Sequence, residues 1–527
     1  MLGFLRALQE DKPRGVLLLL VYLSLLVDNM LLTVVVPVIP DYLVTSEGLV
    51  LAPVPQDPFP LTAGLRGDNA SSRLTATSPS SASAAASPPS AAGCGPGPGR
   101  GMGKCGAGAE GGSATRPAAA VTEESDGSGE GGRVGLLLSS KAWVQLAANP
   151  VVGVLTATLG TRIPLLAGSI NLVLASMLFA LGESYAGLFV ARSLQGVASA
   201  CIGVAGMCLV AEQFPEESER SRALGLVLGS IALGVLLGYP LGSVAYEFLG
   251  KPAPFLVVCG LAFVLALLQL TLLDVRSPTQ AGAPAAPAAP ALSTRWRALV
   301  SDWAVLLSAG AILLSSSCLA ILEPCLPIWL KTSIRPEKWQ MGTVFLPDSV
   351  GYLLGTHFLG EPALWLGRWR VASAALMLLG VSAALVCTAR NLWQLVLPHF
   401  GLGLGVGSVD AALVPLLAYL VDTRHGAGYG AVYALQQTAV SLAYALGPML
   451  GGALMRVVGF PWLMRSLGAL CLLCSPLLAL LARLDMPDKL PQRRRSLASQ
   501  AVVNYQSGEA PPHRTAYARF GDSDDSD

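Results

Sequence analysis

The sequence predicts an all-α membrane protein whose helices form two groups of six. Three observations predict this class. Only 13% of the 527 residues are charged, against about 25% in a typical soluble domain, and the mean hydropathy is +0.58. Apolar runs of about 20 residues, the length that crosses a bilayer, recur about twelve times along the chain. A polar break at 275–303, rich in alanine and proline, separates the first six runs from the last six.

The apolar runs set the boundaries of the twelve predicted spans. The first run keeps Asp28 and Asn29 and has no small-residue cleavage site after it, so we interpret it as a retained helix and not as a signal peptide. The predicted spans are 15–40, 134–157, 163–182, 186–212, 222–247, 254–274, 304–330, 341–360, 371–388, 393–421, 429–455 and 461–483.

The polar segments predict the topology. Basic residues in 1–14, in the central loop 275–303 and in the tail 484–527 favour the cytosol, and an even number of spans allows all three to lie there. The halves are then 15–274 and 304–483. Residues 41–133, within the first half, are rich in Ser, Ala, Gly and Pro, so we expect a disordered lumenal loop. It holds a glycosylation sequon at Asn69. Six plus six helices around a cytosolic central loop is the layout of a major facilitator transporter.

Composition also excludes several classes of function. A net charge of +1 leaves no footprint for nucleic acid, and the hydropathy excludes a soluble enzyme. Eight of the ten cysteines lie in or beside apolar segments without metal-ligand spacing, so we expect no metal and no cofactor. Cys94 and Cys105 lie in the predicted lumenal loop, where they could pair.

We single out five ionisable side chains well inside predicted spans: Asp28, Lys141, Arg192, Glu323 and Asp410. The structural interpretation is that they are buried ions that pair and fix helix packing, and it is favoured for Arg192. Asp28 and Glu323 each stand in an otherwise apolar helix with no basic partner in that helix, so for them we favour function.

A carboxylate inside a membrane has two uses. It attracts a cation more strongly than it would in water, because the local dielectric constant is low. Burial also lets it bind and release a proton in the physiological range. A group that holds either a proton or a cation, combined with alternating access, gives coupled exchange. The sequence therefore predicts a membrane exchanger of protons and small cations.

Two further patterns have both a structural and a functional interpretation. Glycines recur every four or five residues in the fifth predicted span, where they could serve packing alone or form a seal against proton leak. Aromatic residues near the expected midplane are more often packing or interfacial residues than ligand contacts, although some could form a cation–π wall for an amine. They are Trp329, Phe345, Tyr352, Tyr433 and Tyr444.

Several segments make the chain resemble the vesicular amine transporters, and the vesicular monoamine transporters most closely. They include LLVDNMLLTVVVPVIPDYL in the first span, LLLSSKAWVQLAANP around Lys141, ARSLQG at Arg192, ILEPCLPIW at Glu323 and SVDAALVP at Asp410. The resemblance covers nearly all twelve spans and misses 41–133, the central loop and most of the tail. PEESERSRALG and the PDY after the first span are more similar to the vesicular acetylcholine transporter.

The resemblance implies a proton antiporter that loads cytosolic monoamines into acidic secretory or synaptic vesicles. Asp28 and Asn29 would meet the substrate ammonium, and Glu323 would lie at the substrate site. Asp410 would bind protons, while Lys141 and Arg192 would belong to the ion-pair network. Phe345, Tyr352 and Tyr444 fall at pocket or gate positions. The implied partners are a small cationic amine, protons, the bilayer and trafficking machinery that would bind the acidic tail.

The chain departs from the family where the family carries two more acids. Gln437 replaces the eleventh-span acid that would pair with Lys141, and Leu265 replaces a sixth-span acid of the monoamine branch. We expect Lys141 either to pair with Asp28 or Asp410 or to lose its proton, with altered or weakened coupling. Two alternatives stay open: an acetylcholine-type transporter, and a coupling-impaired relative that binds amines.

Overall fold

The computed structural model of the chain describes residues 12–47, 126–273, 292–425 and 428–484. Within these ranges the regular secondary structure is helical and contains no strand. Most of the predicted disordered loop, at 48–125, lies outside the described residues, as do Asn69, Cys94, Cys105 and the acidic tail.

The N-terminal half consists of six long helices. They are α2 (Lys12–Glu47), α3 (Asp126–Leu159), α4 (Arg162–Leu181), α5 (Tyr185–Gln213), α6 (Glu217–Leu249) and α7 (Pro252–Leu272). Each apolar run of the sequence therefore lies within one helix. Helices α2 and α3 reach into the segment 41–133, so the predicted disordered loop is too wide at both ends. Extending an existing helix costs much less than starting one, which lets it run on into polar residues.

The C-terminal half is more broken. It contains α8 (Leu292–Ser301), α9 (Trp303–Ser333), α10 (Lys338–Thr343), α11 (Leu346–Leu359), α12 (Pro362–Leu366), α13 (Arg368–Val386), α14 (Leu392–Leu420), a π-helical turn (Val421–His425), α15 (Gly430–Val458), α16 (Phe460–Cys474) and a 3₁₀ segment (Ser475–Leu484). The short helix α8 lies inside the predicted central loop.

Eleven helices of the described chain are long and apolar enough to cross a membrane, one fewer than predicted. The exception is the eighth predicted span, 341–360. The prediction of a single continuous helix there is wrong. The chain turns at Val344 and Phe345, and α11 has only 14 residues. Pro347 lies in the first turn of α11. Because proline lacks an N–H and fits the start of a helix, it favours a new helix at this point.

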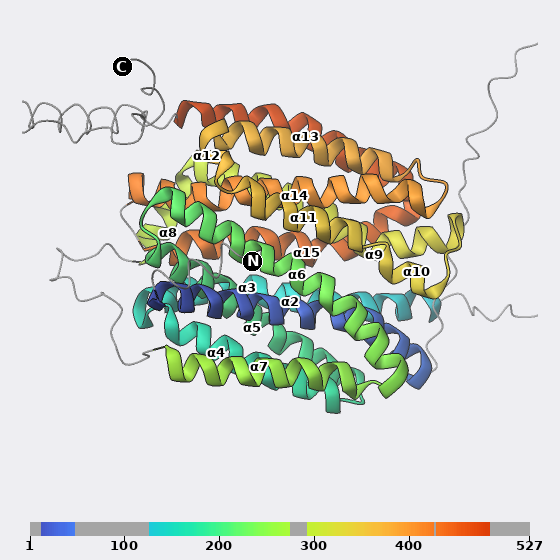
Figure 1. Ribbon diagram of the computed structural model, residues 1–527. Helices are drawn as coiled ribbons and strands as arrows, with labels where there is room; N and C mark the ends of the chain where they lie inside the picture. The colour runs from blue at the N-terminus through green and yellow to red at the C-terminus, as the bar shows by residue number, and fades with distance from the viewer. Residues whose placement is uncertain (1–11, 48–125, 274–291, 426–427, 485–527) are drawn as a thin grey trace, which may run out of the picture. The chain divides into compact units, whose positions relative to one another are not determined.

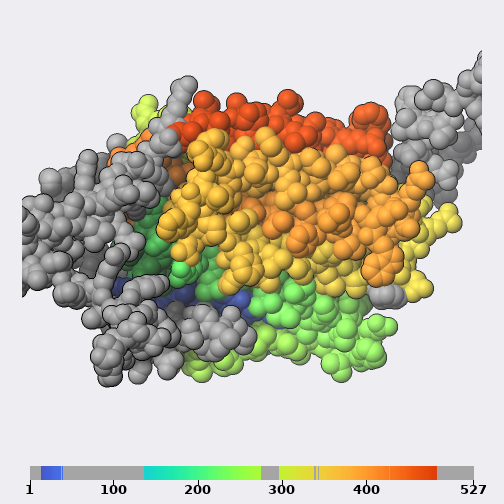
Figure 2. Space-filling model, turned by 45° about the horizontal axis from the view of Figure 1, so that its top comes forward, coloured from blue at the N-terminus to red at the C-terminus, as the bar shows by residue number. Residues whose placement is uncertain are grey.

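The helices of each half pack mainly against one another, as the ribbon and space-filling views show (Figures 1 and 2). In the first half, α2 packs on α6, and α5 packs on α3 and α4. In the second half, α14 packs on α11 and α13, while α9 packs on α15. The halves meet chiefly where α3 contacts α15 and where α6 contacts α11. Any side chain that acts between the halves must come from these helices or from their neighbours.

The glycines of α6 serve as contact points on two sides. A Cβ atom at Gly225 would lie 2.6 Å from the carbonyl oxygen of Thr356 on α11. At Gly238 it would clash with Thr33 and would lie 2.8 Å from the carbonyl oxygen of Met30, both on α2. Small residues allow such close approach of helix backbones. The structure therefore gives these glycines a packing role, and a seal against proton leak stays a prediction.

Ion pairs join the two halves at the end of the bundle where α6 begins and α14 ends. Arg220 of α6 donates to Asp422 at 2.7 Å, and Asp422 also accepts from the hydroxyl of Tyr429 at 2.7 Å. Arg368 of α13 lies 3.0 Å from Glu217 of α6, and both side chains are buried. Buried charges are stable when they are paired in this way. At this end of the bundle, ion pairs as well as helix packing hold the two halves together.

Candidate functional site

Asp28 lies near the middle of α2, and its side chain is 3% exposed. Its Oδ1 accepts a hydrogen bond of 2.7 Å from the Ser199 hydroxyl of α5. The carboxylate also interacts electrostatically with Lys141 of α3 and Arg192 of α5. Three helices of the N-terminal half therefore converge on this predicted residue.

Lys141 and Arg192 connect this cluster to the C-terminal half. Lys141 interacts electrostatically with Asp28 and with Glu323 of α9. Arg192 interacts with the same two acids, and its guanidinium donates to the side chain of Gln195 at 2.8 Å. Of the two partners that the sequence suggested for Lys141, the structure supports Asp28, and Asp410 is not among the groups that interact with Lys141 in the described chain. The structure thus brings two acids and two bases together across the interface.

Glu323 lies on α9 immediately before Pro324, with Pro327 one turn further. Two prolines in one helix remove two backbone donors, so the preceding turn carries carbonyl oxygens without intrahelical partners. The Glu323 carboxylate interacts with the bases of the other half and with the Tyr444 side chain of α15. Its half-buried position between the halves fits a group that exchanges partners.

Asp410 forms a separate centre within the C-terminal half. It lies on α14, is 6% exposed and accepts 2.8 Å from the Tyr352 hydroxyl of α11 through Oδ2. Its Oδ1 is buried, and no group of the described chain donates a hydrogen bond to it. An ionised carboxylate in such surroundings is costly, whereas a protonated one is not. Asp410 therefore suits a group that is neutral when no cation is present.

The remaining predicted residues divide between the site and the packing around it. Asn29 donates to the carbonyl oxygen of Leu25, so its amide is engaged within α2. Phe345 stacks on Tyr239 of α6 with ring centroids 5.6 Å apart, which links the two halves.

Two other aromatic candidates serve packing. Trp329 stacks on Phe460 with ring centroids 4.9 Å apart, and Tyr433 is fully buried with no hydrogen-bond partner for its hydroxyl among the residues described. The cation–π interpretation gains no support at these two positions.

The two replaced family acids lie in different surroundings. Gln437 of α15 packs its amide against Gly203 of α5, where a Cβ atom would lie 3.1 Å from the amide carbon. It therefore faces the helix that carries Arg192. Leu265 is 4% exposed and belongs to the hydrophobic core of the first half.

Four side chains at the site were missed from the sequence. Ser199 and Tyr239 carry no charge and have no distinctive spacing, so only the fold reveals them. Asp348 and His399 lie inside the predicted spans 341–360 and 393–421, and the membrane-depth criterion that selected Asp28 applies to both. Asp348 interacts electrostatically with Glu323.

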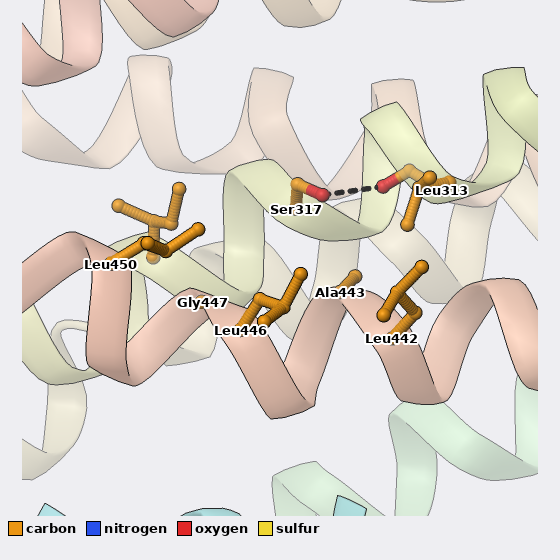
Figure 3. A pocket seen from close by; sticks show the side chains of 8 residues that line it. Leu313, Ser317, Leu442, Ala443, Leu446, Gly447 and Leu450 are labelled. Carbon is orange, nitrogen blue, oxygen red and sulfur yellow. Dashed lines mark hydrogen bonds between the residues drawn. The ribbon is translucent and has the colours of Figure 1, made fainter. Parts of the chain in front are cut away.

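A pocket of about 170 Å³ lies between α9 and α15 (Figure 3). Its lining is leucine, isoleucine, alanine and glycine with a single hydroxyl, that of Ser317, which donates to the carbonyl oxygen of Leu313 at 2.7 Å. Because no charged group lines it, this pocket does not suit an ammonium ion. In the described part of the chain, no group of three or more His, Cys, Asp or Glu side chains could hold a metal ion.

Comparisons with known proteins agree with this architecture. The family model of the Major Facilitator Superfamily matches residues 113–370 and 324–514. A synaptic vesicular amine transporter of Bos taurus is 39% identical over 487 residues, covering 90% of each chain. A chromaffin granule amine transporter of Rattus norvegicus is 36% identical, covering 94% of this chain and 92% of its own.

Two further matches bear on specificity and on fold. A vesicular acetylcholine transporter of Homo sapiens is 36% identical, covering 94% of this chain and 87% of its own. The crystal structure of the human organic anion transporter MFSD10 superposes with a TM-score of 0.64 at 16% identity, covering 89% of this chain and all of that one. That likeness concerns the fold alone.

Proposed function

This chain belongs to the major facilitator superfamily and to its vesicular amine transporter family, and from that premise we propose that it exchanges protons for cytosolic monoamines across the membrane of acidic vesicles. It is a transporter and not an enzyme. The proposed cargo is an amine of the serotonin, dopamine, noradrenaline or histamine type, and both termini would lie in the cytosol.

The observation that carries the proposal is the cluster of Asp28, Lys141, Arg192 and Glu323 between the halves. Without substrate, the two acids are balanced by the two bases. An entering ammonium competes with these bases for the carboxylates, and a proton competes with the ammonium. Because the cluster spans the interface, a change of its occupant alters how strongly the two halves attract each other. This is the link between binding and alternating access that exchange requires.

Uptake into acidified vesicles tests the proposal. Radiolabelled serotonin is added to sealed vesicles that contain the protein, with an acidic interior and with or without a protonophore. We expect accumulation of about tenfold per pH unit for each proton exchanged, and we expect it to collapse with the protonophore. Binding of serotonin without gradient-dependent accumulation would instead support the coupling-impaired alternative, which the replacement at Gln437 motivates.

Acetylcholine is the second candidate cargo. It is favoured by the 36% identity to a vesicular acetylcholine transporter and by PEESERSRALG, which includes the buried Arg220. Competition between unlabelled acetylcholine and unlabelled serotonin against a labelled monoamine separates the two. Stronger displacement by acetylcholine would overturn the monoamine assignment.

A further inference from the structure

Asp348 is an acid of α11 that lies outside the group of residues to which the proposed function assigns a role. It lies in the first turn of α11, and its Oδ1 is buried and has no hydrogen-bond donor among the described residues. A Cβ atom placed on Gly403 of α14 would lie 2.8 Å from this same oxygen. The carboxyl group is therefore held between α11 and α14, at a point where α14 has no side chain.

The titratable groups around Asp348 do not offset the negative charge that its carboxylate carries when ionised. The titratable groups that interact with it are Glu323 of α9, Tyr239 of α6, Tyr352 of its own helix and Tyr444 of α15. None of them is a base, and within the described residues Asp348 has no salt bridge. Lys141 and Arg192, in contrast, both interact with Asp28 and Glu323. Within the described chain, the site thus holds two acids that interact with bases, Asp28 and Glu323, and two that do not, Asp348 and Asp410.

Tyr352 connects the two unbalanced acids. It follows Asp348 by four residues, so the two side chains share a face of α11. Its hydroxyl donates to Oδ2 of Asp410 at 2.8 Å and interacts electrostatically with Asp348. Oδ1 of Asp410, like Oδ1 of Asp348, is buried and accepts no hydrogen bond from the described ranges of the chain.

His399 is a further polar side chain buried on this pair of helices. It is fully buried on α14, and neither ring nitrogen has a hydrogen-bond partner in the part of the chain that the structure describes. Its ring lies edge-on to Phe345, with centroids 6.0 Å apart. Phe345 precedes Asp348 by one turn of chain, and His399 precedes Gly403 by one turn, so the imidazole and the carboxyl occupy adjacent levels of the same helix pair. Buried polar groups without partners are rare in native proteins, so each one is a candidate functional position.

We propose that Asp348 is a second proton-binding carboxyl of the transport site, next to Asp410, and that it releases its proton when an amine binds at Asp28 and Glu323. Without amine, a charged Asp348 would face the charge of Glu323 with no base beside it, so the protonated form is stable. An ammonium held by Glu323 replaces that repulsion with attraction and allows Asp348 to ionise. This inference rests on the proposed amine transport and adds a second proton-binding residue to it.

The test is the pH dependence of amine binding by the purified full-length chain. The dissociation constant of radiolabelled serotonin is measured from about pH 5.5 to about pH 7.5, where each proton released on binding changes it about tenfold per pH unit. We expect the slope of log Kd against pH to fall by about one in Asp348→Asn and to be kept in Asp348→Glu. Glu247→Gln is the matched control, because Glu247 is an exposed acid on α6. Asp410→Asn should keep the part of the slope that belongs to Asp348.

Several outcomes would overturn the inference. One is an unchanged slope in Asp348→Asn, and another is a loss of affinity by the same factor at every pH, which would make Asp348 an amine contact. A slope of zero in Asp410→Asn would assign all released protons to Asp410. Infrared titration of the amine-free protein measures the same proton if Asp348→Asn does not fold: a protonated-carboxyl band that is unaltered in Asp348→Glu would contradict the proposal. Vesicle uptake that succeeds alongside an unchanged slope would refute the inference and leave the proposed function intact.

Discussion

Asp28 is the residue at which substrate and proton are expected to compete most directly. Changing Asp28→Asn keeps the shape of the side chain and removes the charge that an ammonium needs. We expect gradient-driven serotonin uptake to fall at least about tenfold, since a hydrogen bond to a charged group contributes about 1.5–3 kcal/mol. Asp302→Asn, the same change at an ordered aspartate outside the spans, should keep uptake. Full pH-driven loading by Asp28→Asn would rule out the exchange mechanism.

A substitution at Gln437 tests whether the bases of the cluster have been reassigned, that is, whether they pair with Asp28 and Glu323 in place of the eleventh-span acid that this chain lacks. Two acids and two bases now balance one another, so Gln437→Asp adds a negative charge near the helix that carries Arg192. The new carboxylate should compete with Asp28 and Glu323 for Lys141 and Arg192 and should shift the pH profile of uptake. Gln437→Asn, which stays neutral, is the control. Identical uptake by Gln437→Asp and the unmodified chain at every pH would count against the reassignment.

Much of the site could be predicted at the level of single residues, because a charged side chain in an apolar run is conspicuous. Asp28, Lys141, Glu323 and Asp410 stand out on this ground. Their partners do not. The hydroxyl of Ser199 meets Asp28 from 171 residues away, and no local pattern indicates that contact. The division of the acids into two balanced and two unbalanced ones is likewise a property of the assembled helices.

At the scale of elements, apolar runs predicted most helices well, and proline and charge chemistry decided the exceptions. The eighth predicted span is divided because Pro347 starts a new helix and leaves α11 short. Helix α8 forms in the predicted central loop, directly before Asp302, which begins α9. Such interruptions depend on a few polar contacts, which a count of apolar residues does not detect.

Asp302 illustrates such a contact and gives a prediction for pH. Burial acts to raise the pKa of Asp302, but the N–H of Ala304, Arg424 at 3.1 Å and the imidazole of His425 at 3.1 Å together hold this pKa below its usual range. An acid with a lowered pKa in the folded state stabilises the fold above its unfolded-state pKa, and this contribution is lost as pH falls through the folded-state pKa.

We therefore expect Asp302→Asn to lower the Tm of the detergent-solubilised protein by the same amount at about pH 7 and about pH 5. The difference from the unmodified chain should shrink only below about pH 4, where aspartate protonates in the unfolded chain. Thermal unfolding at several pH values measures this. A difference that disappears between about pH 7 and about pH 5 would show that the Asp302 carboxylate is not what stabilises the start of α9.

At the scale of the whole molecule, transport requires the two halves to move against each other, whereas contacts inside each half should persist. Two side-chain contacts of similar geometry allow a matched comparison. Asn149 of α3 donates to Ser441 of α15 at 3.1 Å, across the halves. Ser373 of α13 lies 2.9 Å from Ser475, hydroxyl to hydroxyl, within the second half. Cysteines at each pair of positions can be tested for disulfide formation, which requires Cβ atoms about 3.5–4.5 Å apart.

In a background without the native cysteines, we expect oxidation of the Asn149→Cys and Ser441→Cys double variant to stop serotonin uptake, and a thiol reductant to restore it. The disulfide then joins α3 to α15 and so holds the two halves together. Oxidised Ser373→Cys and Ser475→Cys should transport as well as its reduced form, since that bond moves with one half. Mass spectrometry verifies each cross-link. Equal uptake by the oxidised and reduced forms of the cross-half variant would mean that the contact between α3 and α15 persists throughout transport, and the motion would have to be sought elsewhere than between these helices.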